Sequence, residues 1–183
     1  MKRLFRDLTV AAALVVATTA TGRAQGGVIA DLMSDVAQVE QKMVSLAKAM
    51  PADKFDWRPG AGVRAFGEVV LHVAADNYLI PVMGGVAADA ATGITSDYNT
   101  AVAYEKRKMS REAAIAEMEK SFAHLQKAMQ GTAAGSLGEK VQMFGQSFTR
   151  QQMWILATTH LHEHLGQAIA YARSNGVKPP WSQ

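Results

Sequence analysis

The sequence His160-Leu-His-Glu-His-Leu-Gly-Gln167 holds three of the five histidines of the chain. It lies within a segment without proline, residues 149–174, which predicts one long helix. Residues four apart lie on the same face of a helix, so His160 and His164 can direct two imidazoles at one metal ion. His162 points to the other side and is expected at the surface. A third ligand must come from another part of the chain.

The residues around this stretch predict where its helix begins and ends. Thr149, followed three residues later by Gln152, matches a capping box, which satisfies backbone N–H groups at a helix start. Asn175-Gly176 is typical of a helix end, and the prolines that follow favour an extended tail. The histidine-rich stretch therefore belongs to the last helix of the chain.

Apolar residues three and four apart predict two more amphipathic helices, over residues 28–50 and 110–130. Ser110 is expected to cap the second of these helices, because a serine hydroxyl can accept a hydrogen bond from the first turn. Gly131 is expected to end it.

A further helix over residues 63–80 is expected to end at Pro81 and the two glycines that follow. Residues 81–109 give the weakest pattern, with a short turn of helix expected over 98–104. Residues 131–147 are expected to form a loop, since no segment alternates as a strand would. Four helices joined in part by two longer crossover loops predict an all-α four-helix bundle.

The start of the chain predicts a secretory signal peptide. Three basic residues precede an apolar run, and Gly22-Arg23-Ala24 resembles a small-x-small cleavage site. The apolar run is short for a spanning helix, and no cysteine follows it to carry a lipid, so we expect no stable membrane anchor after cleavage. Cleavage near Ala24 predicts a periplasmic or secreted protein with a single domain over residues 25–183.

The charge and the absence of cysteine limit the classes of function. The chain carries 19 basic and 16 acidic residues, and residues 1–24 hold four of the basic ones and one of the acidic ones. The mature chain is therefore neutral, with 15 of each, and we expect no nucleic-acid partner. Without cysteine there are no disulfides, thiolate ligands or cysteine nucleophile, so any metal site must use histidine and carboxylate side chains.

His72 is the histidine that can supply the third ligand. Valines flank it in the helix predicted over residues 63–80, so its side chain is expected to face the core. A single histidine on an apolar face is more often a hydrogen-bonded core residue than a ligand, but the His160 and His164 pair favours the ligand role. Three imidazoles with open coordination positions are typical of a catalytic or exchangeable site, and they suit Zn, Ni, Fe, Cu or Mn.

Carboxylates and an amide flank these histidines. Glu68 and Asp76 lie four residues to either side of the third histidine, and Glu163 and Gln167 lie beside the other two. These side chains are candidates for orienting the ligands or for transferring a proton. The metal would lower the pKa of a bound water or thiol, or polarise a carbonyl. Glu68 can instead pair with Arg64, four residues earlier.

An ordered set of motifs resembles a known family. The set covers essentially the whole mature chain and resembles the DinB/YfiT-like superfamily of metal-binding four-helix bundles, with an ending like that of an exported bacterial branch. The motifs that carry this resemblance are Trp57-Arg58-Pro59, Arg64-Ala65-Phe66-Gly67-Glu68-Val69-Val70-Leu71-His72, His160-x-x-x-His164-x-Gly166-Gln167, Tyr171-Ala-Arg-Ser-Asn-Gly176 and Pro179-Pro180-Trp181-Ser182.

The resemblance implies an up-down-down-up bundle, a homodimer, and a divalent metal held by His72, His160 and His164. Members similar to this chain include thiol-cofactor-dependent transferases and isomerases and metal-dependent hydrolases. Many relatives have a second histidine just before the last ligand, where this chain has Glu163. They often have an arginine where this chain has Leu165, so one candidate for binding an anionic substrate is missing.

Three functions remain open. The first is a metal-dependent enzyme, of hydrolase or thiol-dependent transferase type, that acts on a small molecule bound near the 81–109 and 131–148 loops. The second is a non-catalytic exported bundle that binds a metal or a small ligand. The third is a non-covalent haem-binding bundle. Export weighs against cytosolic thiol cofactors and favours hydrolysis or plain metal binding.

Overall fold

The computed structural model describes residues 27–182, so the predicted signal peptide lies outside the described residues. These residues form five helices and a small hairpin, with short 3-10 turns at Ala52–Lys54, Ala90–Thr92 and Ala134–Ser136. The helices are an N-terminal helix over residues 27–49, α2 (Phe66–Met83), α3 (Tyr98–Glu105), α4 (Arg111–Gln130) and α5 (Arg150–Ser174), and the strands are β1 (Lys140–Met143) and β2 (Gln146–Thr149).

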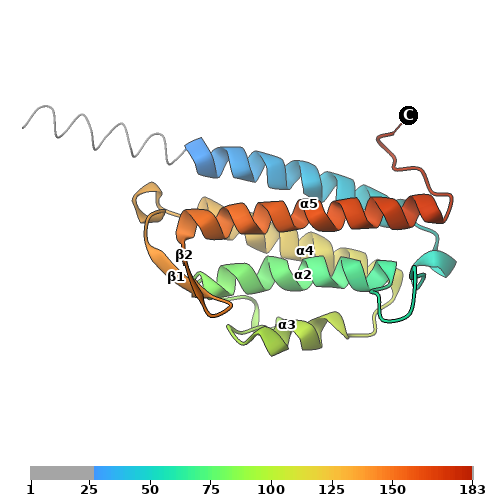
Figure 1. The fold of residues 1–183 in the computed structure, drawn as a ribbon, viewed down its shortest axis with the longest axis horizontal. Coiled ribbons are helices and arrows are strands. Elements are labelled where there is room, and N and C mark those ends of the chain that lie inside the picture. Colours follow the sequence, from blue (N-terminus) through green and yellow to red (C-terminus); the bar gives the residue numbers. More distant parts are fainter. Residues whose placement is uncertain (1–26, 183) are drawn as a thin grey trace, which may run out of the picture.

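The four long helices form the predicted bundle. The N-terminal helix and α5 run in one direction, while α2 and α4 run in the other, which gives the up-down-down-up order (Figure 1). The short helix α3 lies along the outside of α2 in the crossover between α2 and α4. None of the described helices is long and apolar enough to cross a membrane.

The helix α2 is the central element of the bundle. It packs against α3, α4 and α5, and all of its residues except Glu68, Val82 and Met83 are buried. A helix that is apolar on nearly every side must be covered on nearly every side. Polar residues of α2 such as His72 and Asp76 are therefore forced into contact with the neighbouring helices, and α5 supplies their partners.

The predicted caps are confirmed. Ser110 accepts a hydrogen bond from the backbone N–H of Ala113, and Thr149 forms the capping box with Gln152. The short helix expected over 98–104 is also present, as α3.

The predicted end of the second helix was wrong. Pro81 lies inside α2, which continues to Met83 and ends at Gly84. Proline lacks only its own N–H, so near the end of a helix it costs one hydrogen bond and leaves the last residues to form theirs, as Gly84 does with the carbonyl of Ile80.

The prediction of a loop without strands over residues 131–147 was also wrong. The strands β1 and β2 pair antiparallel there, with Val141 opposite Phe148 and Met143 opposite Gln146. The two residues of the turn, Phe144 and Gly145, both have positive φ (52° and 75°), as tight hairpin turns require. Phenylalanine is rare in this conformation and glycine is common in it. Only Gly145 of the two turn residues is therefore of a type that predicts such a turn.

Candidate metal centre

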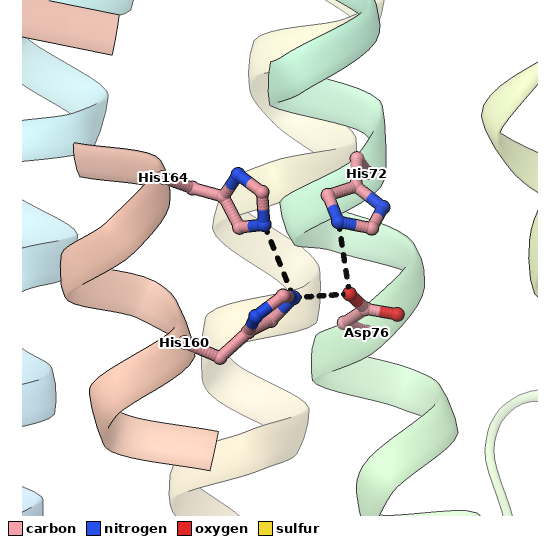
Figure 2. Close-up of side chains that lie close together, drawn as sticks. All are labelled: His72, Asp76, His160 and His164. Carbon is pink, nitrogen blue, oxygen red and sulfur yellow. Dashed lines mark hydrogen bonds and ion pairs between the residues drawn. The ribbon is translucent and has the colours of Figure 1, made fainter. Parts of the chain in front are cut away.

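Two helices bring four side chains to one point in the bundle. His72 and Asp76 are four residues apart on α2, and His160 and His164 are four apart on α5 (Figure 2). One ligand atom of each side chain lies within 4.8 Å of the others. The three histidines predicted as ligands therefore meet, and Asp76 joins them with a carboxylate oxygen.

The spacing of the four atoms suits a small cation. His160 Nε2 lies 3.1 Å from His164 Nε2 and 2.7 Å from Asp76 Oδ2, and His72 Nε2 lies 3.2 Å from the same oxygen. Bonds of about 2.0–2.1 Å to a tetrahedral ion place ligand atoms about 3.3–3.4 Å apart. The three contacts given are close to this spacing, and the remaining pairs of ligand atoms lie within 4.8 Å.

Three members of the cluster are buried and the fourth is partly exposed. His72, Asp76 and His164 are each less than a tenth exposed, while 27% of the His160 side chain is exposed. A carboxylate and several imidazoles in such a place need partners, because burial penalises polar groups that have none. His160 is the member of the cluster with the most contact with solvent.

Each histidine has a second partner on the ring nitrogen that points away from the cluster. His72 Nδ1 lies 2.5 Å from Glu105 Oε1, and His160 Nδ1 lies 3.4 Å from Glu163 Oε2. His164 Nδ1 donates to Gln167 Oε1 at 2.9 Å.

These outer contacts determine which ring nitrogen is available. The Gln167 amide donates to the hydroxyl of Tyr171 at 2.9 Å, which leaves its oxygen to accept from His164. The Nδ1 of His164 therefore carries the proton, and the Nε2 lone pair of His164 points into the cluster, towards His160 Nε2. The arrangement matches that of metal-ligating histidines, which almost always donate their other N–H to an acceptor.

The pKa values of two histidines move in opposite directions. The hydrogen bond and charge of Asp76 raise the pKa of His160 above its usual range, against the effect of burial. Burial is the largest cause that lowers the pKa of His164 to about 4, and the neighbouring imidazoles lower it further. At neutral pH, His164 therefore offers an unprotonated nitrogen to the cluster.

Glu163 and Gln167 lie beside the cluster as expected, but Glu68 does not contact it. Its carboxylate accepts a hydrogen bond from the backbone N–H of Ala65 at 2.7 Å and pairs with Arg58 at 3.3 Å. It therefore caps the start of α2. The alternative pairing of Glu68 with Arg64 is also wrong, since Arg64 pairs with Glu105.

Glu105 is the residue that sequence reasoning missed. It is the last residue of α3, in the stretch with the weakest pattern, and no periodicity connects it to His72, 33 residues earlier. His162 was predicted correctly as a surface residue: it is exposed and contacts Asp35 at 2.9 Å.

The fold and sequence were compared with those of known proteins. A DinB-like protein from Bacillus cereus superposes with a TM-score of 0.68 at 16% identity, over 83% of this chain and 95% of that chain. A DinB-like protein from Bacillus subtilis gives 0.62 at 16% identity, over 84% and 97%. A mycothiol-dependent maleylpyruvate isomerase gives 0.60 at 13% identity, over 75% of this chain and 59% of that one.

At these identities the structural matches show a shared fold and nothing further. No curated protein sequence matches the chain. The family model of the DinB superfamily matches residues 36–168, a range that spans most of the bundle and includes all four side chains of the cluster. This chain belongs to the DinB superfamily.

Proposed function

We propose that the protein binds one divalent metal ion through His72, Asp76, His160 and His164. The observation that carries the proposal is the convergence of three imidazole nitrogens and one carboxylate oxygen within 4.8 Å, in a place where three of the four side chains are buried. Three neutral imidazoles and one carboxylate leave a divalent ion with one positive charge. This ligand set suits Zn, Ni, Fe or Mn.

We further propose that the bound metal serves a metal-dependent enzyme of hydrolase type, with thiol-dependent transfer as the second reaction class. A bound divalent ion lowers the pKa of a water or thiol that binds to it, and it polarises a bound carbonyl group. His160 is the ligand nearest to solvent, so a small-molecule substrate would approach along its side of the cluster. Glu163, three-quarters exposed and beside His160, is placed to accept a proton there.

A non-catalytic metal binder is the competing function, and one observation favours it. Four protein ligands can fill a tetrahedral ion, and catalytic zinc sites usually keep one position for water or substrate. The two functions therefore differ in what Asp76 does: as a permanent ligand it closes the site, and as a displaceable one it opens it.

The location and assembly of the protein are part of the proposal. The N-terminal sequence supports export after cleavage near Ala24, to the periplasm or outside the cell. Assembly as a homodimer rests on the family resemblance. Fractionation of cells and the molar mass in light scattering test these two points separately from the metal.

The function is tested by metal binding first and turnover second. Equilibrium dialysis of the mature protein against Zn²⁺ and Ni²⁺ is expected to give one tightly bound ion per chain. The loaded protein is then screened against ester, amide and thiol substrates, with His160→Ala as the inactive reference. Turnover that depends on His160 supports the enzyme, and metal binding without turnover of any substrate class supports the binder. Absence of bound metal would refute both.

A further inference from the structure

We propose that Glu105, held in place by Arg64, is a positioning residue that fixes the imidazole of His72 with its Nδ1 protonated and its Nε2 turned towards the metal. This inference adds a residue to the proposed metal site. Its predicted effect on Zn²⁺ affinity rests on the proposed function, because the effect requires that the site binds a metal. Its structural part, the protonation of Nδ1, holds with or without a metal.

The geometry consists of two linked contacts. Glu105 Oε1 lies 2.5 Å from His72 Nδ1. Glu105 Oε2 accepts a hydrogen bond from Arg64 Nε at 3.0 Å and forms an ion pair with Arg64 Nη2 at 3.0 Å. Only 6% of the His72 side chain and 11% of the Glu105 side chain are exposed. A charged carboxylate this deeply buried stays in place because each of its oxygens has a partner.

The helix α3 holds Glu105 where it is needed. Tyr104, the residue before it, is buried, packs against Tyr78 of α2, and donates its hydroxyl to Glu117 of α4 at 2.9 Å. The end of α3 is thereby fixed to both α2 and α4. Glu105 therefore approaches His72 from a rigid element, and little conformational freedom is lost when the contact forms.

The three histidines are not equivalent in their outer partners. Gln167 offers His164 a neutral amide oxygen at 2.9 Å, and Glu163 offers His160 a carboxylate at 3.4 Å that is 73% exposed. Glu105 alone combines a charge, a short contact and burial. A carboxylate that accepts a hydrogen bond from a ligating imidazole orients the ring, so His72 should be the best-ordered ligand of the three.

The proposal predicts a specific loss of metal affinity. Glu105→Gln, which removes the charge but keeps the shape, should weaken Zn²⁺ binding by about 10–100-fold in competition with a chromophoric chelator. Glu105→Asp, which keeps the charge but withdraws the carboxylate, should cause a partial loss. The matched control is Glu119→Gln on α4, whose exposed carboxylate pairs with Lys48 and contacts neither α3 nor the cluster; it should leave the affinity within about twofold. Equal affinities for Glu105→Gln and Glu119→Gln would overturn the proposal.

A double-mutant cycle tests whether Arg64 acts through Glu105. Arg64→Gln alone should weaken Zn²⁺ binding less than Glu105→Gln does. The double variant should be no weaker than Glu105→Gln, because Arg64 has no separate route to the metal. Fully additive losses would assign Arg64 a different role and overturn its part in the arrangement.

The protonation of the ring is measured directly and separates this inference from the metal site. Long-range ¹⁵N–¹H correlation spectra of the metal-free and Zn²⁺-loaded wild-type protein should show a proton on His72 Nδ1 in both. An unprotonated Nδ1 in either state would overturn the inference even if metal binds. A protonated Nδ1 in a protein that takes up no metal would support the positioning by Glu105 and refute the proposed function instead.

Discussion

Two groups of histidines lie in one bundle, a cluster of three and a single residue, and they differ in their partners. His72, His160 and His164 have partners on both ring nitrogens and direct their Nε2 atoms at one point. His124 of α4 is half-buried, with its ring 5.3 Å from that of Tyr78, and its buried Nε2 has no hydrogen-bond partner among residues 27–182. Burial by itself therefore does not make a metal site, whereas convergence with outer partners does.

The electrostatic surroundings of the two groups differ in the same way. Burial lowers the pKa of His124, and the charge of Lys127 lowers it further. No carboxylate contributes to that shift, whereas Asp76 raises the pKa of His160 in the cluster. A divalent cation is favoured near carboxylates and disfavoured beside a lysine, so the surroundings of the cluster suit such a cation and those of His124 do not.

The largest effect that distinguishes the two groups is on metal affinity. A free energy of metal binding of about 10–16 kcal/mol, shared among four ligands, gives about 2.5–4 kcal/mol for each. His164→Ala should therefore weaken Zn²⁺ binding by about 60–700-fold. The matched change His124→Ala should have no effect. Competition with a chelator measures the Zn²⁺ affinity of both variants. A similar loss of affinity in both would show that the two groups of histidines do not differ in metal binding.

Asp76 is expected to have the next largest effect. Asp76→Asn keeps the shape and removes the charge, so metal affinity should fall by about 10–100-fold. In the metal-free protein, the pKa of His160 should fall as well, because Asp76 is the largest cause of its raised value. NMR titration of the imidazole protons measures the second effect. An unchanged pKa of His160 would show that the contact with Asp76 is not made in solution.

Acid should destabilise the metal-free protein through His164. Its pKa is lowered to about 4 in the folded state, so the unfolded chain binds a proton first as the pH falls below the usual value of 6.5. Stability is therefore complete above that value and is lost as the pH falls towards 4.

The linkage gives the size of this acid effect. A loss of about 2 kcal/mol from His164 is expected between pH 7 and pH 5, and the His160 contribution has the opposite sign because its pKa is raised. Urea unfolding of the wild type and His164→Gln at both pH values isolates the His164 part. If His164→Gln is as acid-sensitive as the wild type, this assignment is wrong.

The smallest effect is expected at His162, which lies on the far side of the same helix. Its contact with Asp35 is between two exposed side chains. Such pairs contribute about 0–1 kcal/mol, so His162→Ala should change the free energy of unfolding by less than about 1 kcal/mol. Metal affinity should not change, and a tenfold loss in dialysis would place His162 in the site after all.

The parts of the fold that sequence reasoning predicted have local causes. The caps at Ser110 and Thr149 act over three residues, and the pairs on α2 and α5 lie four residues apart, so both are visible in a single helix. The meeting of His72 with His160 and His164 was predicted because the valines beside His72 turn it towards the core and because the family resemblance implies these three ligands.

The parts that were missed depend on contacts far apart in sequence or on unusual backbone. The approach of Glu105 to His72 requires the packing of α3, which its short sequence does not reveal. The hairpin depends on Phe144 at positive φ, which its residue type does not favour. The carboxylate of Glu68 binds a backbone N–H at the start of α2 and does not reach the cluster, because the first N–H groups of a helix have no partner within the helix.

X-ray absorption at the zinc edge measures whether the four side chains of the cluster hold one ion. The wild-type protein would be loaded with one equivalent of Zn²⁺ and freed of unbound metal by gel filtration. The expected result is an ion that remains bound, with three imidazole nitrogens and one carboxylate oxygen at about 2.0–2.2 Å. Loss of the ion on the column, or a first shell with fewer than three imidazoles, would contradict it.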